Sequence, residues 1–335
     1  MAGRFALRVI DAAGSPRAIG RALGEEGRAA LRAVALDGPY WRAATDPAHT
    51  TTMRALTEAT AARFPAIHEE IAGLAEGLGL PFDAVMAWQG RGDLVANTGD
   101  GCTSVQWPGA EPVIGHNEDG LPGFCDHAFL ARVMPEGAPD FLSFCYPGSI
   151  PGHTFAVTGA GIAQAVNNIR LRDPRPEIPR MVVSRAVLAC ESLDQAVALI
   201  RENSRSGGFH ITLAQAGDAR LLSAEYGGGA ASVVEIASPA VHANHALHLE
   251  TGAAGQAITP SSADRQARGE VLLAAGRRDP LAILRDTGGA GLPIFRTAPD
   301  DPDDENTVAT ALITLASGAL RLTVCDPAGV CRDIV

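Results

Sequence analysis

The sequence predicts an α+β fold in which two antiparallel sheets are flanked by helices. The first 98 residues show a helical apolar period, and the strand-like runs begin after residue 102. Helical pairs interrupt the later strands at two points, which places helices outside the sheets. We expect one domain over residues 1–335, with a helix-rich segment at 1–101 and a strand-rich segment at 102–335.

Apolar spacing predicts the helices of the first segment. A short strand is expected at residues 5–10, followed by helices at 16–42, 51–64, 64–78 and 81–95. The clearest helix has apolar residues three or four positions apart, at Phe64, Ile67, Ile71, Leu74 and Leu78. Glycines 77 and 79 end this helix, and Pro81 begins the next one.

Short apolar runs between Gly and Pro turns predict the strands of the second segment. They lie at residues 103–107, 112–117, 128–134, 141–146, 154–158, 162–167, 209–214, 220–226, 231–236, 307–315 and 320–324. Helices are expected at residues 181–190, 193–202, 262–275 and 281–285. The acidic run 300–305 predicts a solvated loop.

Composition excludes several classes of function. The net charge is −11 with no basic cluster, which argues against nucleic acid or an anionic membrane as a partner. All 27 basic residues are arginine, so a Schiff-base lysine and a P-loop lysine are absent. The six cysteines form no CxxC pair, and no apolar run has the length of a signal peptide or membrane span. We therefore expect a soluble cytoplasmic protein with free thiols.

A cysteine directly follows a glycine where the two segments meet. If the bond between Gly101 and Cys102 is cut, Cys102 becomes an N-terminal residue that carries a nucleophile and a base together. The α-amino group, with a pKa of ~7.7–8.0 against ~8.5 for a free thiol, can take the thiol proton. A glycine at 101 tolerates the strained backbone that an N-to-S acyl shift needs. Without further evidence, a single cysteine is more often a small, buried, apolar side chain than a catalytic nucleophile.

Four motifs together resemble a known family. They are Ile-Ala-Gly-Leu-Ala-Glu-Gly at residues 71–77, Asp-Gly-Cys-Thr-Ser at 100–104, Gly-His-Asn-Glu-Asp at 115–119 and Ala-Asn-His at 243–245. In this order, the chain resembles the acyl-coenzyme A:6-aminopenicillanate acyltransferase family of N-terminal-nucleophile hydrolases. The resemblance implies a four-layer αββα sandwich and self-cleavage between Gly101 and Cys102.

The resemblance also implies roles for individual residues. Cys102 would be the nucleophile, and its own α-amino group would be the general base. Asn244 would donate its side-chain amide to the oxyanion, and Asp119 would orient the precursor bond or the new amine. An Asn can stabilise an oxyanion without titrating, and a carboxylate beside an ammonium holds the amine in place. From the residues alone, Asp119 could instead cap a turn before Gly120, and Asn244 could satisfy backbone groups at a strand end.

Three further residues are candidates for the site. Asn117 belongs to the Gly-x-Asn-x-Asp motif, and His245 follows Asn244. Arg296 stands where the family has a functional arginine, although an ordinary surface arginine fits the sequence equally well. Family members often have an aromatic residue after the motif's aspartate, where this chain has Gly120, so the shape of the acyl pocket and the substrate stay open.

Other constellations explain less of the sequence. His242, His245 and His248 suggest a metal site, but on a strand only the outer two share a face. A papain-like pair of Cys102 and His245 leaves Gly101 unexplained. The glycines at 159–161 and 227–229 lack the pattern of a nucleotide-binding loop. The segment 170–180 is expected to be a surface loop, or a lid whose arginines meet a substrate carboxylate.

The sequence thus predicts an autoprocessed cysteine amidohydrolase or acyltransferase that needs no cofactor and no metal. Its substrate would be a small amide or thioester: an N-acyl, aminoacyl, β-alanyl or penicillin-like molecule. Hydrolysis is favoured over transfer because water is always present. The alternatives are an uncleaved, non-catalytic binding or assembly protein and a papain-like hydrolase. A homo-oligomer is left open.

Overall fold

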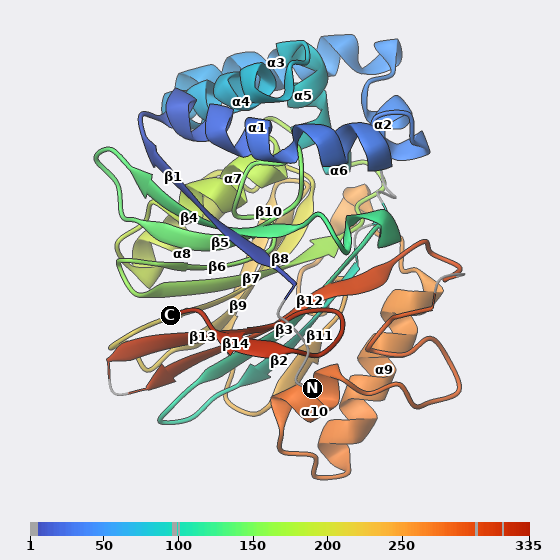
Figure 1. The fold of residues 1–335 in the computed structure, drawn as a ribbon. Coiled ribbons are helices and arrows are strands. Elements are labelled where there is room, and N and C mark those ends of the chain that lie inside the picture. The colour runs from blue at the N-terminus through green and yellow to red at the C-terminus, as the bar shows by residue number, and fades with distance from the viewer. Residues whose placement is uncertain (1–5, 96–98, 100, 299–300, 317) are drawn as a thin grey trace.

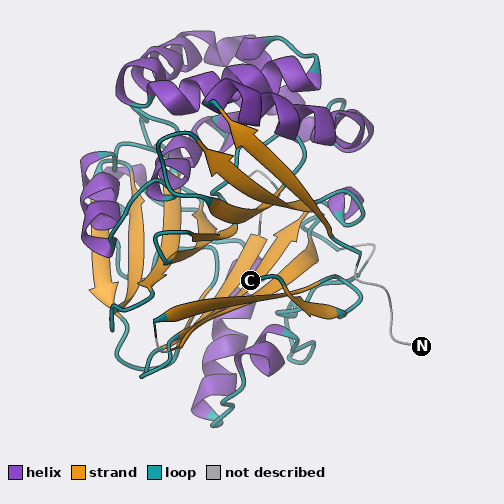
Figure 2. Cartoon of the chain, turned by 60° about the vertical axis from the view of Figure 1, so that its left-hand side comes forward, coloured by secondary structure: helices purple, strands orange, loops and turns teal. Residues whose placement is uncertain are grey.

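The chain folds into two β-sheets that pack face to face with helices on both outer sides (Figure 1). The computed structural model describes residues 6–95, 99, 101–298, 301–316 and 318–335. Figure 2 shows a group of helices on one side of the sheets and a smaller helical group at the opposite end. The expected α+β architecture of two sheets flanked by helices is therefore confirmed.

The larger sheet has eight strands in the order β1-β4-β5-β6-β7-β8-β9-β10. Their bounds are β1 Arg8–Gly14, β4 Phe129–Pro135, β5 Phe141–Cys145, β6 Phe155–Thr158, β7 Ile162–Ile169, β8 Gly208–Gln215, β9 Leu221–Gly227 and β10 Ala230–Glu235. Most neighbours are antiparallel, but β1 pairs with β4 in parallel, so the expectation of purely antiparallel sheets is wrong at this edge. No hairpin joins these two strands, because helices and two strands of the other sheet separate them along the chain.

The smaller sheet has six strands in the order β11-β2-β3-β12-β13-β14. Their bounds are β2 Gly101–Trp107, β3 Val113–Gly120, β11 Ala240–His242, β12 Asn306–Ala316, β13 Ala319–Cys325 and β14 Cys331–Asp333. The short strands β11 and β14 were not expected from the sequence. Strand β2 pairs with β3 over residues 101–107 and with β11 at residues 104–106, so the segment after Gly101 is held in a fixed register against β3.

Helices of the N-terminal segment cover the larger sheet. They are α1 Pro16–Val34, α2 Pro39–Ala44, α3 Thr50–Arg63, α4 Pro65–Leu78, α5 Phe82–Gln89 and α6 Arg91–Leu94. Helices α1 and α4 approach so closely that a Cβ on Gly20 would lie 1.8 Å from the carbonyl oxygen of Glu70. Gly79 ends α4 in the left-handed conformation, at φ 66°, as its position in the sequence predicts.

The remaining helices complete both outer layers. Helices α7 Arg180–Val187 and α8 Leu193–Glu202 accompany the larger sheet, and α9 Pro260–Ala274 and α10 Pro280–Leu284 pack on the smaller one. The segment 170–180, expected at the surface, begins and ends with the buried arginines Arg170 and Arg180. No helix among the described residues is long and apolar enough to cross a membrane.

One pair of cysteines departs from the expected free thiols. Cys325 and Cys331 face each other across the antiparallel pair of β13 and β14 and form a disulfide. The turn between the two strands brings residues six positions apart into register, and the spacing alone does not reveal this. Cys102, Cys125, Cys145 and Cys190 are free cysteines, as expected.

Candidate active site

Cys102 lies near the start of β2, inside the sandwich, with 3% of its surface exposed. Its cross-strand partner on β3 is Glu118, so both side chains point to the inner face of the smaller sheet. The thiol faces Glu118 Oε2 at 3.8 Å. The backbone N–H of Cys102 donates to Asn244 Oδ1 at 2.8 Å. Residues 96–98 and Asp100 of the expected processing segment lie outside the described residues.

Gly101 occupies a position where a side chain would not fit. A Cβ there would lie 2.3 Å from Glu305 Oε2. Gly101 does not adopt a positive φ, so a strained backbone is not the reason for the glycine. The close approach of a buried carboxylate requires it instead.

Asn244 follows β11 and is completely buried. Its backbone N–H donates to Ser262 Oγ at 2.8 Å, and its Oδ1 accepts a second hydrogen bond from Arg265 Nη2 at 2.6 Å. The other side-chain atom, Nδ2, has no hydrogen-bond partner among the described residues. A buried amide donor with no partner in the described part of the chain, beside the N–H of Cys102, is available to an oxygen that enters the site.

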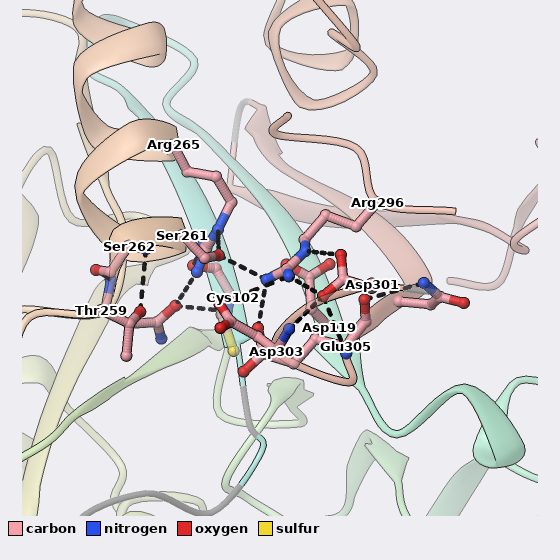
Figure 3. Close-up of polar contacts among 12 residues, drawn as sticks. Cys102, Asp119, Thr259, Ser261, Ser262, Arg265, Arg296, Asp301, Asp303 and Glu305 are labelled. Atoms are coloured by element: carbon pink, nitrogen blue, oxygen red, sulfur yellow. Dashed lines mark hydrogen bonds and ion pairs between the residues drawn. The ribbon is translucent and has the colours of Figure 1, made fainter. Parts of the chain in front are cut away.

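Arg265, on α9, joins the two residues, and the sequence reasoning missed it. Its Nη1 donates to the carbonyl oxygen of Cys102 and, at 2.8 Å, to Thr103 Oγ1. Its Nε donates to Ser261 Oγ at 3.1 Å. The guanidinium therefore ties the start of β2 to Asn244. Figure 3 shows Arg265 beside Cys102.

Asp119, the last acidic residue of β3, is buried opposite Gly101. Its Oδ1 accepts from Thr307 Oγ1 at 2.6 Å, so the interpretation as a turn cap before Gly120 is wrong. Burial raises the pKa of this carboxyl, although the charges of Arg265 and Arg296 act in the opposite direction. Asp119 thus places a carboxyl beside both arginines.

Arg296 is buried rather than an ordinary surface arginine. It donates to Ser261 Oγ and to Glu305 Oε2, each at 2.5 Å, and it forms an ion pair with Asp301. Asp301 and Glu305, two members of the acidic run expected to be a solvated loop, therefore turn inward, because buried guanidinium groups need counter-charges. Figure 3 shows this cluster beside Cys102.

Glu305 also pairs with Arg170, at 3.2 Å. Burial raises its pKa to about 7, despite the opposing charges of Arg170, Arg265 and Arg296.

A second polar group fills the space between the sheets on the inner side of Cys102. Glu118 Oε2 lies 3.1 Å from His116 Nε2, and His116 Nδ1 lies 2.9 Å from Ser104 Oγ. Ser104 Oγ donates to Asn167 Oδ1 on β7 at 2.7 Å. The thiol is thus connected to the larger sheet through hydrogen bonds.

The ligand atoms of Cys102, His116 and Glu118 lie within 4.8 Å of one another. One Cys, one His and one Glu at this spacing match the ligand types of a zinc site with an open position. These three residues are therefore a candidate metal site, separate from the three histidines that the sequence suggested.

Asn117 and His245, the other two sequence candidates, lie in different surroundings. Asn117 points away from the thiol, and its Nδ2 donates to the carbonyl oxygens of Leu284 and Ile294. It anchors the segment around α10 to β3. His245 Nδ1 lies 2.8 Å from Ser262 Oγ, so it contacts the serine that also holds Asn244.

The three neighbouring histidines do not converge on a common point. His242 Nε2 lies 2.7 Å from Glu225 Oε1, and His248 Nδ1 lies 3.6 Å from Glu225 Oε2. Burial favours a raised pKa for Glu225, but hydrogen bonds from His242 and from the backbone of residues 247 and 248 lower it to about 2. The outer two histidines share one carboxylate, which holds the loop that carries Asn244.

A cavity of about 10 Å³ lies directly at Cys102, enough for about one water molecule. Its lining includes Glu118, Tyr146, His153, Arg180 and Phe209. A much larger cavity of about 900 Å³ lies at β1 and β14 and touches none of the candidate residues, so its size carries no functional argument.

Gly120 leaves room for an aromatic ring from elsewhere in the chain. A Cβ at this position would lie 2.4 Å from the hydroxyl oxygen of Tyr146. Tyr146 thus occupies the place that a side chain at 120 would need.

Two comparisons relate the chain to known proteins. The family model described as acyl-coenzyme A:6-aminopenicillanic acid acyl-transferase matches residues 107–328. The chain is also similar to the beta-alanyl-dopamine/carcinine hydrolase of Drosophila melanogaster, with 29% identity over 101 residues. That match covers 27% of this chain and 26% of the relative.

Proposed function

The chain belongs to the acyl-coenzyme A:6-aminopenicillanic acid acyl-transferase family, and from this premise we propose that it is a self-cleaving amide hydrolase or acyltransferase with Cys102 as its nucleophile. The fold would be the αββα sandwich of the N-terminal-nucleophile hydrolases. Cleavage between Gly101 and Cys102 would divide the chain into residues 1–101 and 102–335.

The arrangement of Cys102 and Asn244 carries this proposal. Asn244 Oδ1 holds the nitrogen that would become the new α-amino group, while Nδ2 is buried and has no partner among the described residues. One side chain thus positions the nitrogen and offers a donor to a developing oxyanion. Such a donor is typically worth roughly 2.7–4 kcal/mol in the transition state.

In the mature enzyme, the α-amino group takes the thiol proton, and the sulfur attacks the carbonyl carbon of the substrate. Asn244 Nδ2 donates to the oxyanion of the tetrahedral intermediate. The intermediate collapses to a thioester on Cys102, and the α-ammonium returns the proton to the leaving amine. Water, or an amine acceptor, then releases the acyl group.

The remaining polar residues keep this arrangement in place. Arg265 fixes the orientation of Asn244 and the carbonyl group of Cys102. Asp119, which lies opposite Gly101, supplies counter-charge to Arg265 and Arg296. It would orient the new ammonium indirectly, because Arg265 holds Asn244 Oδ1, the acceptor for the Cys102 nitrogen.

We propose small N-acyl amines as substrates, and β-alanyl amines among them. The similarity to a relative named a beta-alanyl-dopamine/carcinine hydrolase supports this choice and supports hydrolysis over transfer. Tyr146, which occupies the place beside Gly120, would form part of the wall that selects the acyl group.

The papain-like alternative receives less support, because the thiol faces Glu118 while His245 faces Ser262. The non-catalytic alternative predicts that Cys102→Ala keeps the full function of the protein.

Release of the amine from N-β-alanyl, N-acyl amino acid and phenylacetyl amides tests the proposed function. We expect turnover of at least one class and an acyl-thioester on Cys102 that is visible by mass in acid-quenched samples. Cys102→Ala should be inactive. Cys125→Ala, which removes another free cysteine, should stay active. Amide hydrolysis that persists in Cys102→Ala would contradict the proposal.

A further inference from the structure

Self-cleavage needs a base before the α-amino group exists. In the uncut chain the nitrogen of Cys102 belongs to a peptide bond and donates to Asn244 Oδ1. An amide nitrogen whose proton is already donated cannot take the thiol proton. A different group must therefore activate the thiol in the first cleavage step, provided that the proposed self-cleavage occurs.

We propose that Glu118, supported by His116, is the base that activates Cys102 for self-cleavage. Glu118 Oε2 lies 3.8 Å from Cys102 Sγ, and the two residues are direct partners across β2 and β3. The position of this carboxylate is set by the strand register rather than by a mobile loop. Glu118 touches the reacting sulfur, and His116 acts through Glu118.

The hydrogen bonds behind Glu118 fix where the protons lie. Asn167 Nδ2 donates to the carbonyl oxygen of His242, so Asn167 Oδ1 is the acceptor for Ser104 Oγ. Because the single hydroxyl proton of Ser104 is used there, His116 Nδ1 must donate to Ser104 Oγ.

This tautomer leaves His116 Nε2 facing Glu118 Oε2 at 3.1 Å. Two lone pairs do not approach so closely without a proton between them, so the pair shares one proton.

The proposed step moves protons along this connection. The thiol proton passes to Glu118 Oε2 as the shared proton moves fully onto His116 Nε2, so the total charge of the three groups is unchanged. The negative sulfur and the positive imidazole stabilise each other in a water-poor interior.

The bond changes then follow in order. The sulfur attacks the carbonyl carbon of Gly101, the bond from that carbon to the nitrogen of Cys102 breaks, and the stored proton passes to the leaving nitrogen. The product is a thioester of Gly101 with a free amine on Cys102. Water hydrolyses this thioester to the Gly101 carboxylic acid and the free thiol.

Glu118→Gln tests the proposal, because it keeps the shape of the side chain but cannot accept the thiol proton. Chains made by cell-free synthesis are sampled over time, and the cut fraction is measured by intact mass. We expect the variant to cleave roughly 10²–10⁴-fold more slowly than wild type, the usual range for a general base. Glu118→Asp should recover part of the rate.

Two further measurements separate a lost base from a disturbed fold. Hydroxylamine attacks thioesters, so it should not accelerate Glu118→Gln, in which the block precedes the thioester. Glu70→Gln removes an equally buried carboxylate, the partner of Arg185 in the helical layer, and should cleave at the wild-type rate. Thermal unfolding of each variant identifies any loss of folding.

His116→Gln supplies a readout that a structural defect would not move. Gln cannot take up the proton that Glu118 gives up in the proposed step, so the folded variant should cleave more slowly than wild type. Hydroxylamine should not accelerate it, because the block again precedes the thioester. Cleavage within threefold of wild type, or acceleration by hydroxylamine, would overturn the role of His116.

The outcomes distinguish this inference from the proposed function. If wild type cleaves and Glu118→Gln cleaves within threefold of it, Glu118 is not the base. Acceleration of Glu118→Gln by hydroxylamine would equally overturn the inference, because the thioester would already have formed. A wild-type chain that never cleaves would instead overturn the proposed function, and this inference with it.

Discussion

Replacement of Asn244 by aspartate separates the two functions of its side chain. Asp keeps an oxygen at the position of Oδ1, where Cys102 N and Arg265 Nη2 donate at 2.8 and 2.6 Å. It replaces Nδ2, the buried donor without a described partner, by a second oxygen. Arg265 keeps the new carboxylate ionised, so the hydrogen bonds of the uncut chain should persist while the oxyanion loses its donor.

One lost donor corresponds to roughly 2.7–4 kcal/mol of transition-state stabilisation, or about 10²–10³ in kcat. Repulsion between the carboxylate and the oxyanion adds to this loss. The assay is the rate of amine release and, separately, the rate of self-cleavage, with thermal unfolding as the control for folding. Asn244→Ala should also unfold at a lower temperature, because it removes the acceptor of Arg265 Nη2 and of the Cys102 N–H.

A folded Asn244→Asp variant that retained kcat within about threefold of wild type would show that Nδ2 does not serve the oxyanion.

Three further predictions follow from single features of the site. Gly101→Ala places a Cβ 2.3 Å from Glu305 Oε2, so it should lower the free energy of unfolding in urea by about 1–3 kcal/mol and slow self-cleavage. Gly159→Ala is the control, because a Cβ there would make an ordinary contact at 3.4 Å. Glu225 has a pKa of about 2 in the folded chain, against an ordinary value of 4.5 for a glutamate in the unfolded chain. Its contribution to the stability of the fold is therefore complete above pH 4.5, and ~3 kcal/mol of stability is lost as the pH falls through 2. Glu225→Gln should lose the corresponding slope in acid unfolding, and an unchanged slope would contradict the assignment. Zn²⁺ should inhibit turnover by binding Cys102, His116 and Glu118, and a chelator should restore activity. Zn²⁺ that binds purified His116→Gln as tightly as wild type in a calorimetric titration would argue against this site.

Local patterns predicted most of the elements in this chain. The apolar face of α4 and the short runs between turn residues that form β2 and β3 depend on neighbours a few residues away, so local patterns identify them. The junction at Gly101 and Cys102 was visible because residue types and order alone define the motif. The short strands β11 and β14 were missed because three residues carry no measurable period.

Residues whose roles depend on tertiary position were not predictable in this way. Arg265 belongs to a helix with mixed polarity, and nothing in its neighbourhood indicates that it contacts Cys102. Glu118 occupies a variable position of its motif, and only the register of β2 and β3 places it opposite the thiol. Asp301 and Glu305 seemed solvated because acidic runs usually are, but the buried arginines of distant segments draw them inward.

The intact mass of the purified protein, measured beside that of Cys102→Ala, shows whether the chain cleaves itself before Cys102. We expect two polypeptides from wild type, with the masses of residues 1–101 and 102–335, and a single uncut chain from the variant. Wild type that remains one chain, or a Cys102→Ala chain that is cut at the same bond, would contradict this expectation.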